Sequence, residues 1–185
     1  MVDGRAKGNK FEVQIARVIS EWFCGKDFSG RKWYQLPFRR RSPGNAMDGF
    51  TNGAWDLHHV PEYEGMKIEF PFSVELKNQE KWELDGMFHC DKWKPFEWWD
   101  QTLEQAQKTQ ERLLPMLIFT RNRRATYVLL EERVLKWLRP KAVNAPIVSI
   151  KRQDGQSLSL LTMEDMVQVP PSGLVKVYRK QIRAG

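Results

Sequence analysis

The stretch Phe72 to Asn78 reads FSVELKN, and it places an acid and a base inside what otherwise has the character of a buried strand. Side chains in a strand alternate between two faces, so Ser73, Glu75 and Lys77 are predicted to share one face and the apolar residues between them the other. We therefore expect one face to belong to the core and the opposite face to carry the charges. An exposed amphipathic strand shows the same alternation and stays open as an alternative.

A second carboxylate lies upstream, at Asp56 in GAWDLHH, on a neighbouring strand candidate. The turn-prone segment PEYEG separates the two candidates, which favours a hairpin. Pairing of these strands would bring Asp56 and Glu75 to one side near the strand ends. Converging carboxylates are ligands that Mg²⁺ prefers, and a lysine beside them can stabilise charge on a phosphate or orient a water.

The adjacent residues His58 and His59 suggest a different site, that of a His-dependent nuclease of the ββα-metal type. Such a site needs a further Asn and His at helical spacing, which the sequence lacks. Adjacent residues of a strand also point to opposite faces. The carboxylate site is the hypothesis that we carry forward.

Hydrophobic periodicity along the rest of the chain predicts a mixed α/β core. Between the first helix and the hairpin, residues 25–53 are expected to form a possible strand, WYQLPF, and a long functional loop. The remaining candidates are a helix at 9–23, strands near WDLHHV and IEFPFSVELK, a helix at 96–114, strands PMLIFT and TYVLL, and a helix at EERVLKWL.

The character of the chain changes after Pro140, where short strand candidates follow one another. They are IVSIK, LSLL and LVKVYRK, with turns between them. We therefore divide the chain into a core at 1–140 and a β-rich C-terminal extension at 141–185 that packs on this core.

The net charge of +7 favours partners rich in phosphate, although general solubility is the plainer explanation. The basic residues gather in two segments expected to be loops or turns, and we predict that they bind DNA: Arg39, Arg40 and Arg41 in the first, Arg121, Arg123 and Arg124 in the second. The eight tryptophans could stack on bases, but core packing is the commoner use of such residues.

Only two cysteines are present, Cys24 and Cys90, and they form no CxxC pair. This argues against a disulfide framework or a structural zinc site and fits a reducing compartment. No apolar run reaches the length of a membrane span, and the N-terminal stretch lacks the apolar centre of a signal peptide. We expect an intracellular, cytoplasmic protein that does not contact a membrane.

The order Asp56, then Glu75-x-Lys77, resembles the catalytic motif of the PD-(D/E)xK nuclease superfamily, with Trp55 where that motif has proline. The N-terminal part, KGNKFE, is similar to the first helix of the archaeal and phage Holliday junction resolvases within it, and so implies Glu12 as a third metal-associated carboxylate. Their mobile basic loop resembles RRRSPGNAMDG, which implies that Ser42 and one neighbouring arginine contact the cleaved strand.

This resemblance, over about residues 5–130, implies a restriction-endonuclease-like fold with a central mixed β-sheet flanked by helices. It also implies a homodimeric endonuclease that makes paired nicks in four-way junctions, with Mg²⁺ as cofactor and Mn²⁺ able to substitute. Asp56, Glu75, Glu12 and the carbonyl of Leu76 would hold the metal, and Lys77 would position or activate water. A phage protein of this kind would act inside a bacterial host.

Three alternatives remain open from the sequence. Glu12 lies three residues after Asn9 and could complete a capping box, although it also falls on the apolar stripe of its helix. The core could belong to a nuclease that acts on duplex DNA or DNA ends. The chain could also be a non-catalytic DNA-binding protein whose carboxylates lie on a solvated strand face.

Overall fold

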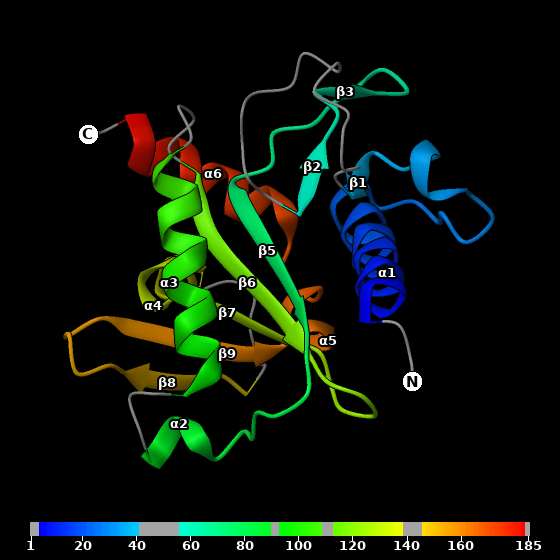
Figure 1. Ribbon diagram of the computed structural model, residues 1–185. Coiled ribbons are helices and arrows are strands. Elements are labelled where there is room, and N and C mark those ends of the chain that lie inside the picture. Colours follow the sequence, from blue (N-terminus) through cyan, green and yellow to red (C-terminus); the bar gives the residue numbers. More distant parts are fainter. Residues whose placement is uncertain (1–3, 41–55, 90–92, 109–112, 139–145, 184–185) are drawn as a thin grey trace.

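The computed structural model describes residues 4–40, 56–89, 93–108, 113–138 and 146–183. Seven strands of these segments form one sheet in the order β1-β2-β5-β6-β7-β9-β8, and two short strands form a separate hairpin, β3-β4 (Figure 1). The strands are β1 (Phe38–Arg40), β2 (Leu57–His59), β3 (Glu62–Tyr63), β4 (Met66–Lys67), β5 (Phe72–Asn78), β6 (Leu114–Thr120), β7 (Tyr127–Glu131), β8 (Val148–Lys151) and β9 (Ser157–Thr162).

The main sheet is mixed. Its central pair, β5 and β6, is parallel, and every other neighbouring pair is antiparallel. The helices are α1 (Gly4–Cys24), α2 (Gly86–His89), α3 (Lys94–Gln107), α4 (Glu132–Leu138), α5 (Met163–Met166) and α6 (Pro171–Arg183), with a 3-10 turn η1 at Trp33–Gln35. The predicted α/β class, a central mixed sheet flanked by helices, is confirmed.

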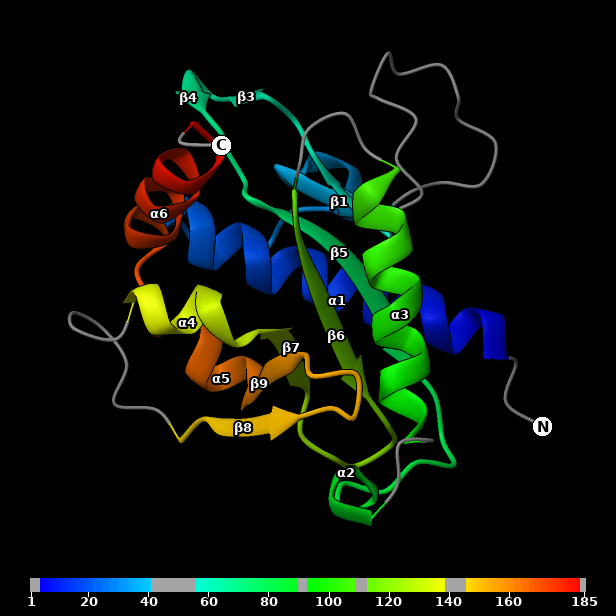
Figure 2. The same ribbon diagram turned by 90° about the vertical axis from the view of Figure 1, so that its left-hand side faces the viewer.

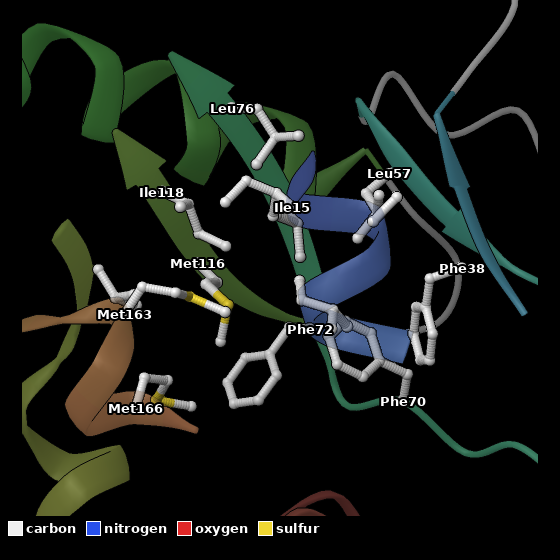
Figure 3. Close-up of a cluster of buried hydrophobic side chains, with 14 of the residues drawn as sticks. Ile15, Phe38, Leu57, Phe70, Phe72, Leu76, Met116, Ile118, Met163 and Met166 are labelled. Carbon is white, nitrogen blue, oxygen red and sulfur yellow. The ribbon is translucent and has the colours of Figure 1, made fainter. Parts of the chain in front are cut away.

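Helices cover both faces of the sheet (Figure 2). On one face, α1, α4, α5 and α6 pack against β5, β6 and β7; Figure 3 shows Ile15, Phe72, Leu76 and Met163 in this core. On the other face, α3 and the segment before it contribute a second core that is rich in tryptophan. The sheet is thus buried on both sides, as near-continuous apolar strands such as β6 require.

The first helix is longer than predicted. It begins at Gly4, so Asn9 lies inside the helix and is not its N-cap. A capping box between Asn9 and Glu12 is therefore excluded. The longer helix also carries Lys7 to the far end of β5, where the Lys7 side chain meets Glu80.

Several element boundaries differ from the predictions. WYQLPF is not a strand, because residues 33–35 form η1 and the strand begins only at Phe38. Arg39 and Arg40 consequently lie in β1 instead of in the long loop. The helix predicted at 96–114 ends at Gln107, and Leu114 opens β6, where it pairs with Phe72.

The C-terminal extension is not simply β-rich. LVKVYRK was predicted to be a strand but belongs to α6, with Pro171 in its first turn and Leu174 buried against the core. Leu174 and Val177, three residues apart, pack against the same core, a spacing that a helix allows and strand alternation does not. The other two candidates are strands, and they extend the central sheet beyond β7.

Most of the described tryptophans are packing residues, as expected. Trp82, Trp93, Trp98 and Trp99 are buried in the α3 core. The Trp99 indole is fully buried and donates a hydrogen bond to Oε1 of Gln156 at 2.9 Å. None of the described helices is long and apolar enough to cross a membrane.

Candidate active site

β2 pairs antiparallel with β5, as predicted, and brings Asp56 to the middle of β5, although PEYEG forms part of the separate hairpin β3-β4 instead of a direct turn between them. Leu57 pairs with Val74 in antiparallel register, and the Asp56 amide donates to the Val74 carbonyl at 3.3 Å. The Asp56 side chain turns back to the same strand, where Oδ2 accepts a hydrogen bond from the Leu76 amide at 2.8 Å. One carboxylate oxygen is therefore fixed, and the other is left for a further partner.

Glu75 is buried, with 4% of the residue exposed. This argues against the alternative of a solvated strand face, because Ser73 on the same face is also buried and α3 covers this side of the sheet. Glu75 Oε1 pairs with Lys77 Nζ at 2.5 Å, whereas its Oε2 is buried without a hydrogen-bond partner. A buried carboxylate oxygen without a partner is costly, and a cation is the partner that would compensate it.

The electrostatics of Asp56 and Glu75 show that the two carboxylates repel each other. Burial and, after it, the negative charge of Glu75 raise the pKa of Asp56 from 3.8 to about 7, although the Leu76 amide and Lys77 act to lower it. Glu12 adds a smaller repulsive contribution. Lys77 therefore does not offset the carboxylates completely.

Glu12 projects from α1 toward this cluster but has its own partner. Arg40 Nη1 lies 3.7 Å from Glu12 Oε2, and the Arg40 guanidinium is 5.3 Å from the centre of the Trp33 ring. Burial raises the pKa of Glu12, Arg40 opposes this shift, and the charge of Glu75 adds to it. Arg40 thus neutralises the third carboxylate from the neighbouring strand.

The donor set fits a hard divalent cation only in part. Asp56 has one oxygen that the Leu76 amide does not use, Glu75 has a buried oxygen without a partner, and the charge of Glu75 acts on Asp56; Mg²⁺ sites often use one or two such carboxylates. Within the described part of the chain, however, no three His, Cys, Asp or Glu side chains are grouped closely enough to hold one ion together. Glu12 is therefore near the pair without completing a three-carboxylate cluster.

The two glutamines near the end of α3, Gln105 and Gln107, differ in burial. Gln105 is half-buried and its Oε1 has no hydrogen-bond partner, whereas Gln107 is exposed. The sequence did not distinguish between these two glutamines. Burial now distinguishes them, because a helix presents only one of two residues spaced by two to the sheet.

The predicted DNA-binding residues of the first basic segment separate into different environments. Arg39 Nε donates to the Leu36 carbonyl at 2.8 Å, which ties this side chain to the turn before β1. Arg40 points to Glu12. Arg41 and Ser42 lie outside the described residues.

The second basic segment is a turn between β6 and β7, as predicted. Arg121 is engaged within the protein, since Nη1 donates to the Trp82 carbonyl at 2.8 Å and its guanidinium pairs with Glu83. Arg123 and Arg124 are exposed. These two, and not Arg121, have side chains available to a partner.

One feature of the site was not found in the sequence. The contact of Trp33 with Arg40 depends on η1, and the only sequence signal was an aromatic pair close to a basic run. The histidine alternative loses support, because His59 packs against Phe38 and Phe70 and burial lowers its pKa to about 4.

Comparison with known proteins identifies the family of the chain. A family described as "Phage putative PDDEXK endonuclease" matches residues 3–176, which is nearly the whole chain. No curated protein and no solved structure matches it. The matched region includes the C-terminal strands β8 and β9 as well as Asp56, Glu75 and Lys77.

Proposed function

Because the chain belongs to the phage putative PDDEXK endonuclease family, we propose that it is a metal-dependent, structure-selective DNA endonuclease that resolves four-way junctions as a homodimer. The observation that carries the catalytic part is the buried pair Asp56 and Glu75 with Lys77 at 2.5 Å from Glu75. The preference for junctions rests on the similarity of KGNKFE and of the Arg39–Ser42 region to the resolvases.

Asp56 and Glu75 would hold the metal through their free oxygens, with the Leu76 carbonyl as a further ligand and Glu12 as a third carboxylate. When bound, Mg²⁺ or Mn²⁺ supplies Lewis-acid stabilisation of the charge that develops on the phosphate. The Leu76 amide holds Asp56 in place for this role. The burial of Glu75 keeps competing water away from the ligand oxygens.

Lys77 would position the attacking water and stabilise the phosphate, because its ammonium lies next to Glu75 while a fifth of its side chain stays exposed. Water would attack phosphorus from the side opposite O3′, in line with this leaving oxygen. The P–O3′ bond would then break, which leaves a 5′-phosphate and a 3′-hydroxyl. Arg40 would move from Glu12 to the scissile phosphate. Two symmetric incisions across a junction require two active sites, which is the reason for the dimer.

The test is cleavage of a labelled four-way junction beside a linear duplex of matched sequence, in Mg²⁺ and in EDTA. Wild type is compared with Glu75→Gln and with Glu164→Gln, an exposed glutamate on α5 that serves as control. We expect paired nicks confined to the junction, lost in EDTA and in Glu75→Gln, with junction binding retained.

Other outcomes discriminate between the alternatives. Equal cutting of the linear duplex would retain the nuclease and reject junction selectivity. Binding without cleavage of either substrate would favour a non-catalytic DNA-binding protein. Cleavage by Glu75→Gln would reject the proposed metal site.

A further inference from the structure

Two loops leave the sheet side by side, immediately after the strands at its centre. β5 and β6 are parallel and in register, with Asn78 opposite Thr120, so the loops that follow them start at the same edge. This is the edge at which Lys77 lies. Equivalent positions of the two loops, each three residues beyond this register pair, are occupied by Lys81 and Arg123.

Both of these residues have a left-handed backbone, with φ of 66° at Lys81 and 59° at Arg123. Residues with a Cβ atom adopt this conformation at an energetic cost, and glycine adopts it freely. Each loop therefore carries a long cationic side chain at a position where glycine would be more stable. Strain of this kind is often retained where the side chain has a function.

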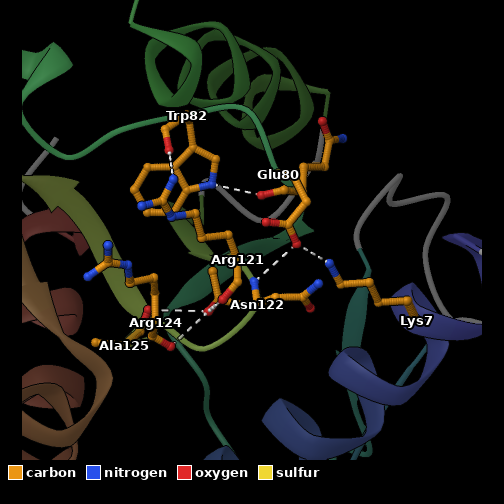
Figure 4. A network of polar contacts seen from close by, with 9 residues as sticks. Lys7, Glu80, Trp82, Arg121, Asn122, Arg124 and Ala125 are labelled. Atoms are coloured by element: carbon orange, nitrogen blue, oxygen red, sulfur yellow. Dashed lines mark hydrogen bonds and ion pairs between the residues drawn. The ribbon is translucent and has the colours of Figure 1, made fainter. Parts of the chain in front are cut away.

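The two loops are locked together by Glu80. Its Oε1 accepts a hydrogen bond from Lys7 Nζ of α1 at 2.5 Å and from the Asn122 amide at 3.1 Å (Figure 4). The Gln79 amide also donates to the Thr120 carbonyl at 3.2 Å. Lys81 follows Glu80 and Arg123 follows Asn122. These hydrogen bonds between the loops therefore hold the two strained cationic residues next to each other.

The acids nearby are already paired. Glu83 is occupied by Arg121, and Glu80 by Lys7. Lys81 and Arg123 are exposed and form no ion pair with any of the described residues. Arg124 is exposed beside them. The result is uncompensated positive charge on a fixed backbone.

We infer that Lys81, Arg123 and Arg124 form a phosphate-binding ridge that grips the DNA backbone beside the Lys77 end of the active site. The occupant is duplex DNA, because the charges are spaced along two parallel loops and present no hydrogen-bonding pattern for bases. This inference rests on the proposed function for its substrate. General solubility is the competing explanation, but it does not require cations at strained positions.

The test exploits the strain. Lys81→Gly and Arg123→Gly remove the charge and relieve the backbone, so each is expected to raise Tm by about 2–4 °C. Arg123→Ala removes the same charge and keeps the strain. Lys176→Ala, at an exposed position of α6, is the control for loss of one exposed lysine; in Figure 1, α6 lies at the end of the sheet opposite the loops that follow β5 and β6.

Binding is measured by fluorescence anisotropy with a labelled linear duplex in EDTA, over a range of salt concentrations. At about 0.15 M salt, each glycine variant should bind about fivefold more weakly, and the slope of log K against log salt should fall by about 0.9 per substitution. Arg123→Ala should lose the same affinity without the rise in Tm. Lys176→Ala should change neither the affinity for the duplex nor Tm.

Affinities and salt slopes of the glycine variants equal to those of Lys176→Ala would overturn the ridge, even if Tm rises. The assay contains no metal and measures no cleavage. Failure of the proposed nuclease activity would therefore appear separately, as wild-type binding through the ridge without metal-dependent nicking.

Discussion

The substitution Asp56→Asn should make the metal-free protein more stable at neutral pH while removing its cleavage activity. Asn keeps an oxygen that can accept the hydrogen bond from the Leu76 amide, so the local geometry is preserved. It removes the carboxylate whose pKa is raised to about 7 by burial and by Glu75. The variant therefore measures how much the ionised Asp56 carboxylate, buried beside Glu75, lowers the free energy of unfolding.

The magnitude follows from linkage. A carboxyl with a raised pKa in the folded state stabilises the protein fully below its unfolded value of 3.8, and this contribution is lost as the pH rises through about 7. The loss is about 1.4 kcal/mol per pH unit inside that window. The free energy of unfolding of Asp56→Asn, relative to that of wild type, should therefore increase by about 2.5 kcal/mol as the pH rises from about 5 to about 8.

His59 makes the comparison with wild type necessary. Burial lowers its pKa from 6.5 to about 4, so its contribution increases with pH over the same range and masks that of Asp56. The contribution of His59 to the free energy of unfolding cancels in the difference between variant and wild type, because both proteins contain this residue.

The assay is urea unfolding of both proteins in EDTA at several pH values, followed by the same series with Mg²⁺ or Mn²⁺. The metal should stabilise wild type at pH 8 and leave Asp56→Asn unchanged, since a ligand that binds only the folded state shifts its stability. A free-energy difference that is constant from pH 5 to pH 8 would refute the reasoning about the carboxylate cluster.

Three further expectations follow from the site and the core. Lys77→Met should reduce the single-turnover cleavage rate by about 100-fold or more with little change in DNA affinity, and an equal loss of both would assign Lys77 to binding alone. Arg40→Gln removes the charge that opposes the raised pKa of Glu12, so the acidic limb of the pH–rate profile should move to higher pH; an unmoved limb would mean that ionised Glu12 is not needed. Trp99→Ala should lower the free energy of unfolding by about 3–5 kcal/mol, because the indole is fully buried, and a loss below about 1 kcal/mol in denaturant unfolding would contradict that burial.

Much of the architecture was predictable because it depends on short-range periodicity. The apolar run at 115–120 and the alternation in FSVELKN predicted β6 and β5, and the antiparallel pairing of β2 with β5 was also predicted, although PEYEG forms part of the separate hairpin β3-β4 between them. Burial of Glu75 was not predictable in this way. It depends on α3, which covers that face of the sheet from a distant part of the chain.

The sequence by itself determined the α/β class and predicted that Asp56, Glu75 and Lys77 lie together, since strand alternation and residue chemistry are local properties. The tertiary structure decided the rest: that Arg40 pairs with Glu12, that Arg121 is occupied while Arg123 is exposed, and that residues 171–183 are helical. Each of these outcomes depends on which surface packs against which. A pattern along the chain specifies the faces of an element, but only the folded arrangement determines what each face meets.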